Sequence, residues 1–492
     1  MTPITRSRLL LFLAAAAASC AAACTAALGP GYTIEKQEIE VHFVADPQQP
    51  AIHVDCVYRL RNDGNRPLSS LEIRLPGRLR FHAVDSHADW EGRALSFEAS
   101  PDNPRNAMIT FGEPWSVSAN RTLHLSVEYR PAAPGDKTFS FAPDAFFLPA
   151  EGWSPQLLPA RGAFATGGVP PAKWLLTVRV PEGFLVHASG RKSKTSRSQG
   201  EQTIRIEQQQ SKDGYAFVIA GHYIAAKVNA APETVSLWSR SSLEAAALRQ
   251  PAAALVNAIH TYDAMFGARS RESHQLWIVE CPIAENCFSG AASDYAQLVL
   301  QAGAKPSAEM ASLDTVMADP SSGAPEIVAA AGPSLASSWL GYGQNPGFFE
   351  QDPPLAALPA FAAIRGREAV QGPQVRADTI RRVLTRIPVH GDPRKPEDDG
   401  VVRAKSLLFF FALQDRYGQQ VFHNAISHML DARRGGGFSL DDLIASFEQE
   451  THQNVAEFVR HWMKRPGVPE DFRARYETSA GATASNPKET TP

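Results

Sequence analysis

Hydrophobic and polar positions alternate with a period of two along much of the chain between residues 32 and 228. Residues 39–44 (Ile-Glu-Val-His-Phe-Val) show this pattern clearly. Three further segments repeat it: residues 52–60, 123–129 and 175–180. A period of two is typical of a strand with one buried face. Because turn-forming clusters such as Asn62-Asp63-Gly64-Asn65 separate these segments, residues 30–230 are predicted to form an antiparallel β-sheet or sandwich domain.

The periodicity becomes helical in the second half of the chain. Residues 244–266 place their apolar side chains on one helical face, with Ser242 as the expected N-cap and Gly267 as the stop. Two short strands and a surface loop are predicted next, at residues 275–280, 296–300 and 301–325. Residues 326–340 are rich in Ala and compatible with a helix, but they contain Gly332-Pro333. A proline inside a helix costs about 3 kcal/mol, so we expect a kink or an interruption there.

The C-terminal part is predicted to be helical. Further helices are expected at residues 402–417 and 420–432, from Ser439 onward, and at 454–463, which is the last helix expected. Ser439-Leu440-Asp441-Asp442 has the spacing of a capping box. Residues 478–492 have a Ser/Thr/Ala/Pro composition that is typical of a disordered tail. The predicted class is therefore α+β and multidomain, with a mainly helical second domain that carries a small sheet at residues 235–477.

Composition and charge exclude some functions. The 492 residues are 44% hydrophobic and 20% charged, as in ordinary globular proteins, and the formal net charge is −3. The sequence has no stripe of basic residues of the kind that would indicate binding to nucleic acid. The small basic run at residues 191–197 is interpreted as a solvated hairpin tip.

The N-terminus is expected to be a targeting segment, residues 1–28. Arg6 and Arg8 precede an apolar run at residues 9–18, which is too short for a permanent membrane helix. The residues before Cys20 and Cys24 resemble a bacterial lipobox, so either cysteine would be lipidated; the alternative is ordinary secretion with cleavage near Ala27. The expected location is the bacterial cell envelope or periplasm, with membrane association through the lipid of a lipoprotein.

Three cysteines follow the targeting segment. Cys281 and Cys287 are six residues apart and could close a small loop as a disulfide, which an oxidising compartment permits. Cys56 lies in an alternating segment and is expected to be a buried thiol. Three cysteines of which one is left over do not make a zinc cluster.

Two motifs point to a known family. Residues 458–469 read Phe-Val-Arg-His-Trp-Met-Lys-Arg-Pro-Gly-Val-Pro, and residues 262–267 read Tyr-Asp-Ala-Met-Phe-Gly. These motifs and the order of the elements resemble the zinc-dependent aminopeptidases that include membrane alanyl aminopeptidase and leukotriene-processing hydrolases. The resemblance covers about residues 35–475, and it implies a thermolysin-like peptidase domain after the β domain.

That family binds zinc through an H-E-x-x-H helix and a glutamate nineteen residues further on. Ala336 and Trp339-Leu340-Gly341 resemble the Ala, Trp and Gly of the family motif and set the register. In this register the ligand and general-base positions are occupied by Pro333, Ser334, Ser337 and Ala356. Proline and alanine side chains have no donor atom, and a neutral serine hydroxyl is a poor zinc ligand. The resemblance therefore implies a degenerate metal site that has lost its zinc cofactor.

Other positions of the family's substrate cleft are partly kept. Glu285 and Asn286 match the end of the family motif whose glutamate holds the substrate's α-amine. The alternative is that Glu285 is an ordinary loop residue without a binding role. Arg403 stands where the family has an oxyanion-stabilising tyrosine, and the alternative is a solvent-exposed cation.

Three functional hypotheses follow. The first is an exported aminopeptidase-like pseudoenzyme that keeps its fold to bind or scaffold a peptide or protein ligand. The second is an active metallo-aminopeptidase with a relocated metal site, and the third is a purely structural envelope protein. The sequence leaves the ligand, the partner and the oligomeric state open.

Overall fold

A computed structural model gives the fold of the chain, which divides into two compact units, Met1–His222 and Tyr223–Pro492. The structure describes residues 31–46, 48–74, 82–90, 93–95, 98–99, 106–130, 141–149, 153–160, 169, 171–209, 216–230, 233–240, 244–267, 275–282, 308–312, 315–337, 339–340, 353–388, 398–432 and 438–477. The targeting segment with Cys20 and Cys24, and the predicted tail at 478–492, lie outside these residues.

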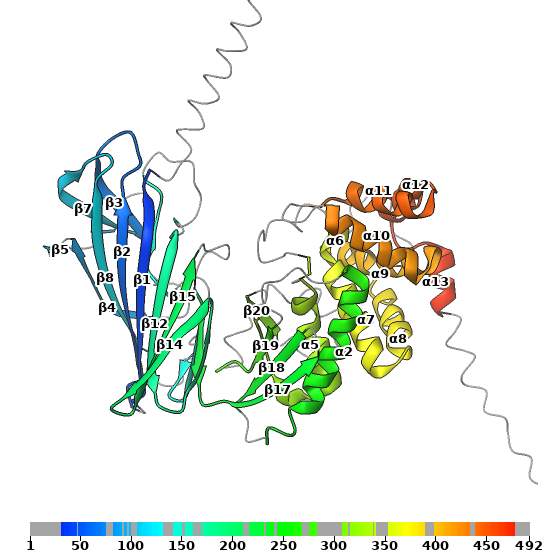
Figure 1. Ribbon diagram of the computed structural model, residues 1–492. Coiled ribbons are helices and arrows are strands. Elements are labelled where there is room, and N and C mark those ends of the chain that lie inside the picture. The colour runs from blue at the N-terminus through cyan, green and yellow to red at the C-terminus, as the bar shows by residue number, and fades with distance from the viewer. Residues whose placement is uncertain are drawn as a thin grey trace, which may run out of the picture. The chain divides into compact units, whose positions relative to one another are not determined.

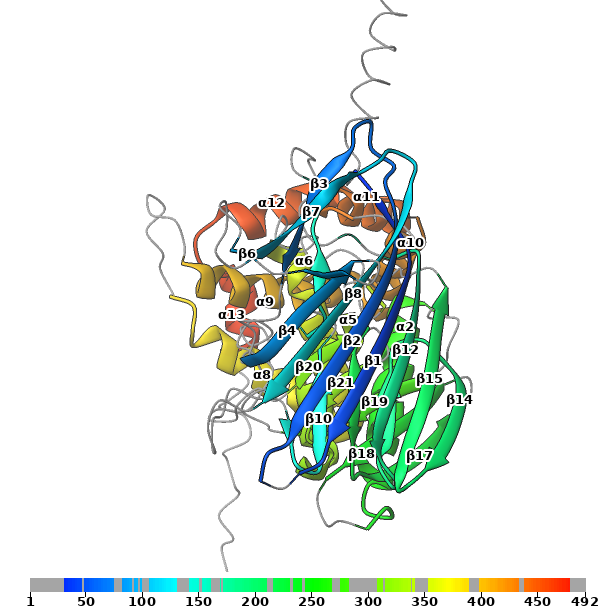
Figure 2. The ribbon, with the colours of Figure 1, turned by 90° about the vertical axis from the view of Figure 1, so that its left-hand side faces the viewer.

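An eight-stranded sheet forms one layer of the first unit (Figures 1 and 2). In spatial order its strands are β14 (Arg191–Ser198), β15 (Glu201–Gln209), β12 (Lys173–Pro181), β1 (Thr33–Val44), β2 (Ala51–Arg61), β8 (Asn120–Arg130), β4 (His82–Trp90) and β5 (Arg93–Leu95). Neighbouring strands are antiparallel except β1 and β12, which run parallel. The four segments with a period of two lie within β1, β2, β8 and β12, so these strand predictions are confirmed.

Two four-stranded sheets complete the first unit. One contains β13 (Leu185–Ala188), β16 (Val218–Gly221), β10 (Ala145–Leu148) and β9 (Phe141–Ala142); the other contains β11 (Gln156–Leu157), β3 (Leu68–Arg74), β7 (Asn106–Trp115) and β6 (Glu98–Ala99). All three sheets contribute buried side chains to one hydrophobic core. Phe43 of β1 packs on Phe146 of β10 with ring centroids 4.9 Å apart, and Trp90 of β4 stacks on Phe111 of β7 at 4.3 Å. The N-terminal β domain predicted from the sequence is confirmed.

The basic run is a strand rather than a hairpin tip. All eight residues of β14 are exposed, and the turn that follows uses positive φ angles at Gln199 and Gly200. Since β14 pairs only with β15 among the described strands, the cations lie along a sheet edge. Charged residues on an edge strand discourage pairing with another chain.

Cys56 is buried at the centre of the eight-stranded sheet, as the sequence predicts. It is fully shielded from solvent and is a free thiol. Burial is the main reason that its pKa is raised to about 12, and hydrogen bonds with Tyr58 and Gln37 oppose this shift. The reactive thiolate is therefore scarce at neutral pH.

We expect iodoacetamide at pH 8 to alkylate Cys56 in the folded protein at least about a hundredfold more slowly than in urea, because alkylation needs a thiolate. Mass spectrometry of the Cys56 peptide after timed quenching measures both rates. Equal rates in the two conditions would show that the thiol is accessible and ionised in the native β unit.

The second unit begins with a five-stranded mixed sheet. Its strands are, in order, β17 (Ile224–Ala230), β18 (Glu233–Ser239), β19 (Gln275–Val279), β21 (Thr315–Ala318) and β20 (Ala308–Ser312). The boundary between the units places β17 here, whereas the β domain predicted from the sequence extends to residue 230. The strand predicted at 275–280 is β19, and the one predicted at 296–300 lies outside the described residues. The surface loop predicted at 301–325 is wrong, because β20 and β21 pair there and β21 is buried.

The other elements that the structure describes in the second unit are helices (Figure 1). They are α2 (Arg249–Phe266), the 3-10 helix η2 (Pro320–Ser322), α5 (Ala324–Ser337), α6 (Pro353–Ala356), α7 (Leu358–Gln371), α8 (Gln374–Leu384), α9 (Asp399–Tyr417), α10 (Gln419–Ala432), α11 (Leu440–Thr451), α12 (Val455–Lys464) and α13 (Glu470–Glu477). The capping box at Ser439 and Asp442 is confirmed. Helices α7, α8 and α13 were not predicted, and α2 begins about five residues later than expected. None of the helices described combines the length and apolarity needed to cross a bilayer.

Pro333 lies inside α5, which runs continuously from Ala324 to Ser337. Of the two outcomes expected from the sequence, the interruption is wrong and the kink stays a prediction. A proline ring normally clashes with the Cβ of the residue before it. Here that residue is Gly332, which has no Cβ. Most of α5 is buried among apolar side chains, and this packing offsets the lost backbone hydrogen bond.

Candidate functional site

The helix that would carry the metal site crosses two other helices closely. α5 packs against both α2 and α7, and α2 also packs against α7. Gly332 of α5 and Gly366 of α7 make this approach feasible. A Cβ on Gly332 would lie 2.9 Å from Ala363 Cβ, and one on Gly366 would lie 3.0 Å from Ala258 Cβ. The glycines thus position α5 by letting helix backbones approach one another.

Tyr262 of α2 fills the space that both glycines leave. Its hydroxyl is 3.0 Å from the Cβ position of Gly332 and 2.8 Å from that of Gly366. The side chain is fully buried, and its oxygen has no hydrogen-bond partner among the described residues. Burial raises the pKa of Tyr262 above its ordinary value, so the phenol stays neutral. The side chain therefore fills space between the helices and does not act as an acid or a base.

Trp339, one of the residues that set the motif register, is fixed just after α5. Its indole Nε1 donates to Asp263 Oδ1 at 2.9 Å. Its ring meets Tyr262 edge-on, with centroids 5.5 Å apart. The family-like segments at 262–267 and 336–341 are therefore in contact through these side chains.

Pro333 and Ser337 lie one turn apart on α5, as the motif spacing requires. Ser337 Oγ donates to the Pro333 carbonyl oxygen at 2.8 Å, which is the common back-bond of a helical serine. Ser337 is 8% exposed, while Ser334 and Pro333 are half-buried. The one side-chain oxygen at a predicted ligand position thus already has a partner within its own helix.

The remaining predicted positions lie on other elements. Ala356 ends the short helix α6, which packs against α9 and α7. Arg403 is half-buried on α9 and has an interaction partner of its own. Two residues further on, buried Lys405 donates through Nζ to the Arg465 carbonyl oxygen. This bond joins α9 to the Arg-Pro-Gly-Val-Pro segment on which the resemblance partly rests.

The residues at the metal positions predicted from the resemblance do not fit a zinc ion. Zinc in proteins is bound by imidazole, thiolate or carboxylate groups. Pro333 and Ala356 offer no side-chain donor atom, and the neutral hydroxyl of Ser337 is a poor zinc ligand. Nowhere in the described part of the chain do three His, Cys, Asp or Glu side chains gather in a way that could hold a metal ion.

Three of the predicted residues lie in a segment outside the described part of the chain. Glu285 and Asn286 lie outside the described residues, so their position relative to α5 stays a prediction. Cys281 is held in a disulfide, while its predicted partner, Cys287, also lies outside the described residues.

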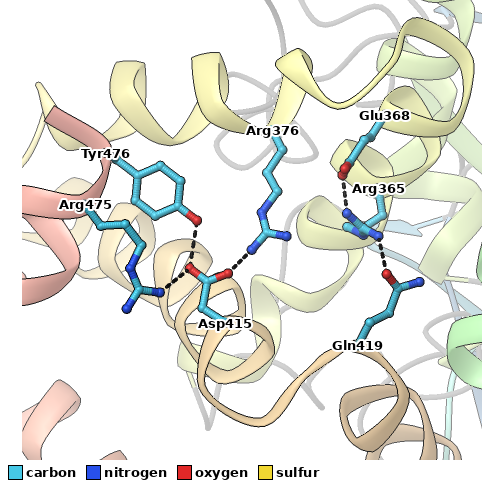
Figure 3. Close-up of polar contacts among 7 residues, drawn as sticks. All are labelled: Arg365, Glu368, Arg376, Asp415, Gln419, Arg475 and Tyr476. Atoms are coloured by element: carbon cyan, nitrogen blue, oxygen red, sulfur yellow. Dashed lines mark hydrogen bonds and ion pairs between the residues drawn. The ribbon is translucent and has the colours of Figure 1, made fainter. Parts of the chain in front are cut away.

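A polar cluster that was not predicted from the sequence joins three helices of the second unit (Figure 3). Asp415 of α9 accepts from Arg376 of α8, and its other oxygen accepts from Arg475 at 3.2 Å and from the Tyr476 hydroxyl at 2.7 Å, both on α13. The pKa of Tyr476 is raised to about 12, first by burial and then by its bond to Asp415. Since two of these helices were not predicted, sequence spacing gave no signal for the cluster.

The comparisons with known proteins bear on the fold. No protein-family model matches the sequence, and no curated protein matches it. Solved structures do match. The M1 zinc metallopeptidase of Deinococcus radiodurans is 16% identical, with 89% of this chain and 95% of that chain covered and a TM-score of 0.51. A mutant of that enzyme bound to a Tyr-Ser-Ala substrate is 15% identical, with 89% and 96% covered and a TM-score of 0.52.

A larger enzyme also matches. Legionella pneumophila aminopeptidase A, in complex with aspartic acid, is 13% identical, with 89% of this chain but 50% of that chain covered and a TM-score of 0.53. At such identities the likeness shows the fold and no more. The chain has the architecture of an M1 metallopeptidase, with a β domain followed by a mainly helical domain.

Proposed function

We propose that this protein is a non-catalytic relative of the M1 metallopeptidases that uses the inherited fold to bind a peptide or protein segment. One observation carries the proposal. On the helix in the family's metal position, the residues one turn apart are a proline and a serine whose hydroxyl donates to that proline's carbonyl. A neutral serine hydroxyl is a poor zinc ligand and the proline side chain has no donor atom, so we do not expect this helix to support the zinc-dependent reaction.

The side chains around α5 are nevertheless closely packed. α5 packs into the core of the second unit, and Tyr262 fills the space beside Gly332 and Gly366. The Trp339 indole donates a hydrogen bond to Asp263 of α2. This packing stabilises the second unit and holds α5 in place. An ordered scaffold without good zinc ligands at the predicted metal positions favours a binding role over metal-dependent hydrolysis.

We expect purified full-length protein to contain far less than one zinc ion per chain by elemental analysis, and to leave a panel of aminoacyl reporter substrates uncleaved. An active zinc aminopeptidase of the same fold, purified identically, controls for metal loss during purification. Stoichiometric zinc would overturn the loss of metal binding. Reporter cleavage that is abolished by chelators and by Glu285→Gln would instead support a relocated site.

The binding role has its own readout. Fluorescence polarisation with a pool of short labelled peptides should show saturable binding without cleavage, and Glu285→Gln should weaken it if this carboxylate still holds the peptide's α-amine. Absence of binding across the pool would favour a purely structural role.

A further inference from the structure

An exposed run of positive charge lies on β14, which forms one edge of the eight-stranded sheet (Figures 1 and 2). The strand reads Arg-Lys-Ser-Lys-Thr-Ser-Arg-Ser, so four of its eight residues are cations and none is acidic, and all eight are exposed. In the hairpin of β14 and β15, residues 191–209, five cations less two carboxylates leave a net charge of +3. Since the whole chain carries −3, the other residues together carry −6, and the hairpin has the opposite sign.

Three of the four cations on β14 are not neutralised within the protein. Arg197 pairs with Glu182 at 3.5 Å, and both side chains are more than half exposed. Arg191, Lys192 and Lys194 make no ion pair or hydrogen bond through their side chains with any residue that the structure describes. Exposed cations without a carboxylate partner attract an external anion.

These three cations lie on both sides of the sheet edge. Lys192 is opposite buried Ile206 of β15, so it lies on the inner face of the sheet. Arg191 and Lys194 are opposite exposed residues of β15, on the outer face, because the register shifts between Lys192 and Lys194. Long cationic side chains on both faces can meet one flat surface that the edge itself approaches.

The chemistry of β14 favours an anionic surface over another macromolecule. Interfaces between proteins depend on aromatic and apolar anchors, and β14 offers none. A peptide strand added to the edge needs a regular ladder, whereas the register shift interrupts it and lysines on an edge oppose such pairing. Single-stranded nucleic acid is bound with aromatic side chains among the cations, which the strand also lacks.

We propose that the β14 edge binds the anionic headgroup surface of a lipid bilayer. Each lysine or arginine near such a surface strengthens binding by about fivefold and needs no apolar anchor to do so. The targeting segment expected at residues 1–28 would bring the protein to a membrane. Stable anchoring commonly combines a lipid with a patch of basic residues, so the cations of β14 would complement a lipid on Cys20 or Cys24. This proposal does not depend on whether α5 binds a metal ion or a peptide.

Sedimentation of the full chain with vesicles tests the proposal. We expect the partition coefficient on vesicles of phosphatidylglycerol and phosphatidylcholine to exceed that on pure phosphatidylcholine by about a hundredfold, from three cations at about fivefold each. Pure phosphatidylcholine measures the binding through the apolar run at residues 9–18 or through an attached lipid, which needs no anionic surface. Raising NaCl to about 0.5 M should remove most of the difference, because salt screens exposed charges.

Two triple variants locate the effect. The first removes the unpaired cations of β14: Arg191→Gln, Lys192→Gln and Lys194→Gln. The matched control removes three exposed cations from other strands of the same sheet: Arg59→Gln, Lys173→Gln and Arg179→Gln. Both variants lose three positive charges at exposed positions, and circular dichroism checks that both keep the fold. Binding to the anionic vesicles should fall about a hundredfold in the first variant and less than about fivefold in the control.

Equal partition of the wild type on anionic and zwitterionic vesicles would overturn the proposal, as would equal losses in the two triple variants. A soluble oligoglutamate peptide is the competing probe. If it binds the wild type through the same three cations while the anionic vesicles do not bind, the edge belongs to an acidic peptide and the lipid assignment is wrong.

Discussion

Replacing Asp415 by alanine should lower the free energy of unfolding of the helical unit by about 3 kcal/mol, because it leaves the partly buried Arg376 without its counter-charge. The Arg376 and Asp415 side chains are 21% and 14% exposed. The same carboxylate accepts from both Arg475 and Tyr476, so α13 loses its polar attachment to α9 in one step (Figure 3). Urea unfolding followed by far-ultraviolet circular dichroism measures the change.

Asp378→Ala is the matched control. Asp378 is 58% exposed and pairs with Arg381 on the surface of α8. An exposed pair of this kind is worth no more than about 1 kcal/mol. Hydrogen exchange adds a local readout. Peptides from α13 should exchange faster in Asp415→Ala than in the wild type, and at the wild-type rate in Asp378→Ala. Equal effects of the two substitutions would show that Asp415 is no more than a surface carboxylate.

Gly366→Val should destabilise the helical unit by about 2–3 kcal/mol, because extra carbon atoms in a packed core force side chains and backbone apart. Even a Cβ at this position would lie 2.8 Å from the Tyr262 hydroxyl and 3.0 Å from Ala258 Cβ. Urea unfolding of the single variants and of the double variant with Tyr262→Phe measures the coupling. Ala369→Val, at an exposed position on the same helix, controls for the helix propensity of valine, about 0.5 kcal/mol.

Tyr262→Phe should rescue part of the loss, about 1 kcal/mol, because it removes the oxygen that the new side chain would meet. Alone, Tyr262→Phe should be neutral or slightly stabilising, since the hydroxyl it removes has no partner among the described residues. A large loss of stability from Tyr262→Phe would show that the hydroxyl makes a hydrogen bond, and would contradict the interpretation that the side chain only fills space.

Much of the fold could be predicted because local patterns decided it. The β1 and β2 segments alternate strictly, and each residue that alternation assigns to the inner face is buried at the centre of the sheet. Likewise, Ser439 and Asp442 fix the start of α11 through bonds that span three residues. Cys56 was predicted to be buried from its place in the same alternation.

Errors arose where long-range interactions overrode local preference. The segment at 301–325 looks like a loop, but the edge of the five-stranded sheet pairs it as β20 and β21. Pro333 was expected to kink or interrupt its helix, yet α5 continues through it, with Gly332 before the proline and two helices packed against α5.

The sequence by itself determined the β domain and the helical second half, because periodicity follows directly from the order of residues along the chain. It also predicted, through the family resemblance, that proline, serine and alanine stand at the metal positions. Only the tertiary structure decided that the Ser337 hydroxyl donates to Pro333, that Tyr262 fills two glycine gaps, and that Asp415 joins α8, α9 and α13. Each of these depends on atoms brought together across helices or turns, and spacing along the chain does not encode that proximity.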